Sequence, residues 1–215
     1  MKEVKEMFWV TALFSLVMII PVGVWQAFDF LGFKVKLLAW GVYYIVFTAA
    51  LAENFLRKKG LGWGELGLGL SGDIKRAAAA GVAGAALSVA AGWFGAEVLG
   101  LKSAATSSFE TMVLKHMSGG GWGGRLFLAW LMFPIALCEE IVFRGIILNY
   151  LAKRKGFLFA LGVSSLLFAL VHASPVRMAH TLVYGLVWGL SYRFGGGLAA
   201  PVTAHYLHNV SAFHF

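Results

Sequence analysis

Three ionisable side chains lie close together inside a long apolar run of the chain. Glu139 and Glu140 follow the apolar residues 131–138, and Arg144 comes four residues after Glu140. Each would cost about 2.5–3.5 kcal/mol at the centre of a membrane helix, so each must be paired or must face water. The four-residue spacing puts Glu140 and Arg144 on one helix face, within reach of an ion pair, and turns Glu139 about 100° away. One buried cluster of all three charges is the alternative interpretation.

Polar side chains also interrupt the apolar segments that follow. His172 comes four residues after Phe168 near the end of one segment, and the last segment carries His205 and Asn209 four residues apart. This spacing directs His205 and Asn209 to one helix face. A single histidine in such a helix is more often a hydrogen-bonded core residue than a catalyst. The signal is therefore the combination of these residues with the glutamates.

Such a set of side chains could hydrolyse a peptide bond. A carboxylate in an apolar helix can serve as a general base, and imidazole or amide groups can stabilise a developing oxyanion. The one cysteine, Cys138, is turned about 100° from Glu139, and no serine or cysteine has a recognisable histidine partner, so water is the expected nucleophile. In an alternative mechanism, Glu139, His172 and His205 bind zinc with water as the fourth ligand. Proton translocation is a rival use of intramembrane Glu, Arg and His.

The composition requires a bilayer around most of the chain. Of the 215 residues, 60% are hydrophobic and 13% are charged, which is about half the charged share of a soluble protein. The net charge of +8 comes from short basic clusters between apolar runs, a pattern typical of segments that flank a membrane. We therefore expect membrane lipid, and not nucleic acid, as the surrounding partner.

The chain is predicted to be an all-α, polytopic bundle of transmembrane helices. A spanning helix needs about 20 mostly apolar residues, and about seven segments qualify, with six to eight possible because the last three are short. They are residues 7–28, 37–56, 77–99, 126–151, 157–174, 177–194 and 197–214. We expect one membrane domain over residues 1–215, with N-terminal helices in 1–60 and the core that carries the polar motifs in 125–215.

Small residues and basic residues predict how these helices are arranged. Gly84, Ser88 and Gly92 recur at every fourth position, as do Gly185 and Gly189, and this spacing lets helices approach closely in lipid. In the predicted topology, eleven of the 18 lysines and arginines lie on the same membrane face as the N-terminus, which favours a cytoplasmic N-terminus. The membrane face to which the polar cluster opens stays undecided.

Taken together, the motifs resemble those of the CAAX protease and bacteriocin-processing family of intramembrane glutamate proteases, which includes the Ras-converting CAAX prenyl protease 2. The similar residues are Glu-Glu-x-x-x-Arg, Phe-x-x-x-His and His-x-x-x-Asn, in this order on successive apolar segments between 131 and 211. Residues 63–76 are similar to the connector that precedes the core. The resemblance implies that Glu140 and Arg144 form a structural pair and that Phe168 supports the site.

Carried over by position, the resemblance further implies that Glu139 is the general base and that His172 helps it to activate water. His205 and Asn209 would line the oxyanion hole. The implied activity is endopeptidase cleavage of a prenylated CAAX C-terminus, a bacteriocin-like leader or another membrane-tethered peptide.

The resemblance favours a mechanism without a cofactor, and the zinc-dependent version and a catalytically silent scaffold of the same fold are the alternatives. The compact chain, without long loops, is typical of a multi-pass protein of a prokaryotic cell membrane.

Overall fold

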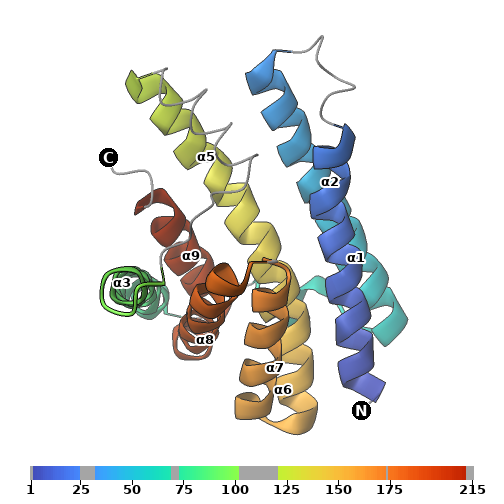
Figure 1. Cartoon of the computed structure of the whole chain (residues 1–215). Coiled ribbons are helices and arrows are strands. Elements are labelled where there is room, and N and C mark those ends of the chain that lie inside the picture. Colours follow the sequence, from blue (N-terminus) through green and yellow to red (C-terminus); the bar gives the residue numbers. More distant parts are fainter. Residues whose placement is uncertain (1, 25–31, 69–72, 102–120, 173, 212–215) are drawn as a thin grey trace.

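The fold is built from helices alone in the part of the chain that can be described. The computed structural model describes residues 2–24, 32–68, 73–101, 121–172 and 174–211 (Figure 1). Helices account for all the regular structure in these ranges, which confirms the predicted all-α class.

Each of the seven predicted spans corresponds to helical structure. The helices are α1 (Lys2–Val24), α2 (Phe33–Lys59), the short η2 (Trp63–Leu66), α3 (Ile74–Glu97), a continuous run of α5 (Gly121–Glu140), η3 (Ile141–Leu148) and α6 (Asn149–Lys155), then α7 (Phe157–Leu170), α8 (Pro175–Gly195) and α9 (Ala199–Ser211). The parts of the predicted spans at 25–28, 173 and 212–214 lie outside the described residues.

The described helices differ in whether they can cross a bilayer alone. Phe33–Lys59, Ile74–Glu97 and Gly121–Lys155 are long and apolar enough. In contrast, α7 has 14 residues and α9 has 13. At 1.5 Å per residue each is about 20 Å long, whereas the hydrocarbon core is about 30 Å thick. The segments 157–174 and 197–214 thus form helices as predicted, but within the described residues they are too short to be full spans.

The helix contacts predicted from small residues are present. A Cβ atom on Gly84 would lie 3.0 Å from the Cβ of Ala204, so α3 and α9 touch at that point. One on Gly185 would lie 3.0 Å from the Cα of Ser165, so α7 and α8 approach at backbone distance. This close packing is what brings the motif-bearing helices α7, α8 and α9 together.

Because of this approach, we expect Gly185→Ala to destabilise the protein by about 1–3 kcal/mol, the usual cost of overpacking. The new methyl group would press on Ser165 of α7. The resulting shift of α8 would also disturb the Gly185 carbonyl, which accepts a hydrogen bond from Arg144. Thermal unfolding in detergent checks this, with Gly162→Ala as the control, since a Cβ there meets nothing within 4 Å. Equal unfolding temperatures for the two variants would contradict the packing described here.

Basic clusters gather at one end of the bundle, where the N-terminus, the end of α2 and the α6–α7 turn lie together (Figure 1). Lys59 pairs with Glu6 of α1 at 2.6 Å. At the same end, Lys153 pairs with Glu65. This grouping agrees with the assignment of these clusters to one membrane face, and the identity of that face stays a prediction.

Candidate active site

The helix that carries both glutamates changes its geometry directly after them. It is α-helical through Glu140, and residues Ile141–Leu148 form the π-helix η3, in which hydrogen bonds reach back five residues. Turns of this kind are rare and frequently occur at functional sites. The residue types gave no signal for the change, and the α-helical spacing used above therefore describes Arg144 only approximately.

The predicted ion pair between Glu140 and Arg144 is present and completely buried. Nη1 of Arg144 donates to Oε1 of Glu140 at 2.8 Å, and neither side chain has any exposed surface. Nη2 donates to the backbone carbonyl of Gly185 at 3.0 Å. The guanidinium also lies 4.9 Å from the ring centre of Phe168 and 5.6 Å from that of Trp188. Arg144 thus ties η3 to α7 and α8.

His205 of α9 lies between the two glutamates. Its Nδ1 is 2.9 Å from Oε1 of Glu140, and its Nε2 is 3.7 Å from Oε2 of Glu139. Its ring stacks on Trp188 with centroids 4.0 Å apart. An ionised carboxylate only accepts hydrogen bonds, so Nδ1 carries a proton when Glu140 is ionised. Nε2 can then donate only if the imidazole is doubly protonated.

Glu139 has a different environment from its neighbour. About 10% of its side chain is exposed, against none for Glu140. The one described basic side chain within 4 Å of its carboxylate is that of His205, at a distance too long for a hydrogen bond. Arg144 makes its ion pair with Glu140 and not with Glu139. The three charges therefore do not form one closed ionic cluster, because no ion pair joins Glu139 to Arg144.

His172 lies at the C-terminal end of α7 and is half-buried. Its Nδ1 is 2.9 Å from the carbonyl oxygen of Phe168. A carbonyl only accepts, so Nδ1 is the protonated nitrogen and Nε2 of the neutral ring keeps a free lone pair. The charge of Glu139 acts on His172, which places the two in electrostatic range.

Phe168 is the centre of an aromatic cluster that joins the motif side chains. Its ring lies 4.9 Å from that of His172 and 6.0 Å from that of His205. Asn209 is one helical turn beyond His205 and half-buried, and its side chain makes no hydrogen bond with another described residue. The structure thus brings six of the seven predicted site residues into one network and leaves Asn209 beside it.

Two aromatic residues at the site escaped the sequence analysis. Trp188 has only 1% of its surface exposed and stacks on His205, although tryptophans in this chain fit an interfacial belt by composition. Its place in the middle of the span 177–194 could have distinguished it. Tyr44 of α2 is completely buried next to Glu139, and nothing in the span 37–56 marks it.

The zinc alternative has no ready ligand set in this arrangement. Among the described residues, no group of three or more His, Cys, Asp and Glu side chains could hold a metal ion.

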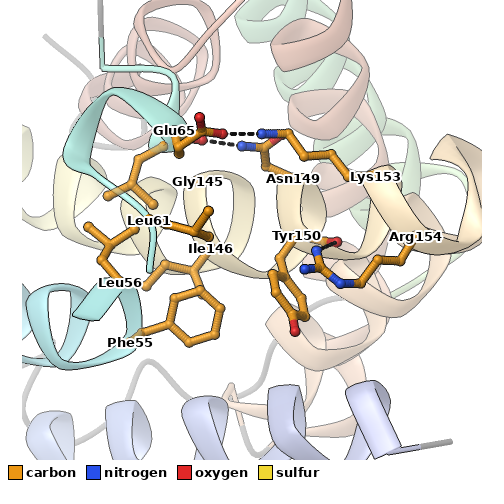
Figure 2. Close-up of a pocket in the computed structure, with 11 residues that line it drawn as sticks. Phe55, Leu56, Leu61, Glu65, Gly145, Ile146, Asn149, Tyr150, Lys153 and Arg154 are labelled. Atoms are coloured by element: carbon orange, nitrogen blue, oxygen red, sulfur yellow. Dashed lines mark hydrogen bonds and ion pairs between the residues drawn. The ribbon is translucent and has the colours of Figure 1, made fainter. Parts of the chain in front are cut away.

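One cavity in the described part of the structure lies away from this site, at the basic end of the bundle (Figure 2). Its volume is about 350 Å³, and none of the motif side chains lines it. Glu65 of η2 lies on one side of the cavity and forms an ion pair with Lys153, whose ammonium lowers the pKa of Glu65. The backbone carbonyl of Glu65 also accepts a hydrogen bond from the Asn149 side chain. These two bonds of Glu65 hold η2 against α6. The cavity is separate from the site around Glu139.

Comparison with known proteins adds one match. Residues 121–211 match the family described as type II CAAX prenyl endopeptidase Rce1-like. The match spans α5 to α9 and contains all seven predicted site residues. No curated protein and no solved structure matches the chain. Residues 121–211 therefore carry an Rce1-like domain over α5 to α9, and this match supports membership in the CAAX protease family.

Proposed function

We propose that the protein is an intramembrane endopeptidase in which Glu139 activates water to hydrolyse a peptide bond of a membrane-associated substrate. The observation that carries this proposal is the unequal environment of two adjacent carboxylates. Glu140 is fully buried and held by Arg144 and His205. Glu139 retains some exposure and has no hydrogen-bonded cation. Of the two, Glu139 is therefore the carboxylate that water can approach and that no ion pair holds in place.

In the proposed reaction, the oxygen of a water molecule attacks the scissile carbonyl carbon while Glu139 takes one of the water's protons. The free lone pair on Nε2 of His172 can hold the same water. His205 and Asn209 donate hydrogen bonds to the oxyanion. Glu139 then gives its proton to the amide nitrogen, the C–N bond breaks, and an acid and an amine leave.

The charge balance of the cluster fits this role for His205. When its imidazole is doubly protonated, two cations, Arg144 and His205, face the two carboxylates, Glu139 and Glu140. A cluster without net charge is tolerated within a bilayer better than a charged one. In that state both ring nitrogens carry protons, so Nε2 can donate to the oxyanion while Nδ1 remains bonded to Glu140.

For the substrate, we propose a peptide that is itself held in the membrane. The Rce1-like match supports a prenylated CAAX C-terminus, and a bacteriocin-like leader has the same requirement of membrane attachment. The site supports the general class, because both glutamates lie in the middle of Gly121–Lys155, a helical run long and apolar enough to cross a membrane.

Cleavage of a farnesylated CAAX peptide library and of leader peptides by the purified protein tests the proposal. We expect cleavage by the parent and none by Glu139→Ala or His172→Ala. His208→Gln is the matched control, because His208 contacts Ser88 and not the glutamates. A folded parent that cleaves no peptide in either set would instead support the catalytically silent scaffold.

Chelation tests the proposal that no metal takes part. We expect the cleavage rate to be unchanged after treatment with a zinc chelator, because Glu139 alone supplies the base. Zinc content of the active protein should be far below one ion per chain. Stoichiometric zinc together with chelator-sensitive cleavage would favour the zinc-dependent mechanism.

A further inference from the structure

Tyr44 occupies a fixed position on the face of α2 that packs against α5. A Cβ atom on Gly41, one turn earlier, would lie 3.2 Å from Leu131 of α5. The Tyr44 ring stacks on Trp40 at 5.6 Å and lies 5.5 Å from Phe14. Phe14 in turn lies 5.7 Å from Phe143, one turn beyond Glu139. Tyr44 is thus held at the level of the glutamates.

The Tyr44 hydroxyl is buried without a hydrogen bond to any described residue. It lies next to the Glu139 carboxylate and interacts with it. An unpaired buried hydroxyl costs about 1–3 kcal/mol. A phenol oxygen lies on the rotation axis of its ring, so turning the clamped ring cannot move the hydroxyl to another partner.

Glu139 therefore stands between two helices that aim polar groups at it. His205 approaches from α9, with Nε2 at 3.7 Å, and Tyr44 approaches from α2. A phenol hydroxyl readily donates a hydrogen bond to a carboxylate. A hydrogen bond from the Tyr44 hydroxyl to one carboxylate oxygen of Glu139 would leave the other oxygen for water.

We infer that Tyr44 is a positioning residue that donates a hydrogen bond to Glu139 and holds its carboxylate in the orientation needed to activate water. This inference rests on the proposed function and adds a residue from outside the matched region 121–211. Tyr44 acts through Glu139 and does not touch the substrate.

Two measurements on Tyr44→Phe test this role. We expect kcat for a cleavable farnesylated peptide to fall about tenfold with KM within about twofold, because a misplaced base affects the transition state more than binding. The matched control is Thr48→Val, which removes another buried and unpaired hydroxyl from the same face, beside Cys138 and not Glu139. Thr48→Val should leave kcat unchanged.

The second measurement does not need activity. In a double-mutant cycle of Tyr44→Phe with Glu139→Gln, we expect the shifts in unfolding temperature to be non-additive by about 2–4 °C, and those of Thr48→Val with Glu139→Gln to be additive. Additive shifts for Tyr44, or an unchanged kcat in Tyr44→Phe, would overturn the inference. Coupling of Tyr44 to Glu139 in a parent that cleaves no peptide would overturn the proposed function and leave the contact standing.

Discussion

Arg144→Met should destabilise the protein by about 3–5 kcal/mol, because it leaves the Glu140 carboxylate buried without its main counter-ion. The bond to the Gly185 carbonyl and the contacts with two aromatic rings are lost with it. For a chain of this size the unfolding temperature in detergent should fall by about 6–20 °C. Arg193→Met is the control, since Arg193 is exposed and its removal should cost at most about 0.5 kcal/mol.

The double variant Arg144→Met/Glu140→Leu separates loss of a charge from loss of a pair. Nε of Arg144 and Oε2 of Glu140 have no hydrogen-bond partner in the described part of the chain, so the pair is not optimised for stability. Replacing both partners by apolar residues should therefore recover part of the lost stability. If the Arg144→Met protein were as stable as the parent, the ion pair between Arg144 and Glu140 would not contribute to stability.

Glu139→Gln should reduce peptide cleavage by about 10²–10⁴-fold, the usual contribution of a general base, while the protein stays folded. Glutamine has nearly the same shape but cannot take the proton of a water molecule. Little stability should be lost, because Glu139 makes no close ion pair. The cleavage rate per folded molecule and the unfolding temperature together measure this effect.

Glu140→Gln is the adjacent comparison and should behave in the opposite way. It removes the charge that Arg144 and His205 both contact, so its main effect should be a lower unfolding temperature. A Glu140→Gln variant that is as stable as the parent and inactive, beside an active Glu139→Gln variant, would reverse the two assignments.

The overall architecture was accessible from the sequence because the bilayer imposes a strong constraint. Apolar runs predicted all seven helical segments, and the spacing of Gly84 and Gly185 predicted close helix contacts that are present. The apolar runs did not predict where the helices begin and end, since α7 ends at Leu170, before the predicted 174, and α9 begins at Ala199, after the predicted 197. Helix ends depend on local backbone geometry and tertiary contacts, which hydropathy does not record.

The site was predictable only as far as contacts within one helix. The pair Glu140–Arg144 follows from a four-residue spacing, and it is present at 2.8 Å. In contrast, the bond between His205 and Glu140 joins residues 65 positions apart, and no spacing rule reaches that far. The stacking of Trp188 on His205 escaped the sequence analysis for the same reason. The family resemblance supplied roles for the residues, whereas the way α9 bridges both glutamates required the structure.

A single turnover in H₂¹⁸O, with enzyme in excess over a cleavable peptide, tests most directly whether water attacks the peptide bond. Direct attack places one ¹⁸O atom in the new C-terminal carboxylate and leaves the carboxylate of Glu139 unlabelled, as mass spectrometry of the product and of the digested enzyme would record. A product without ¹⁸O, or label in Glu139, would mean that this side chain itself attacks the substrate and would contradict the account.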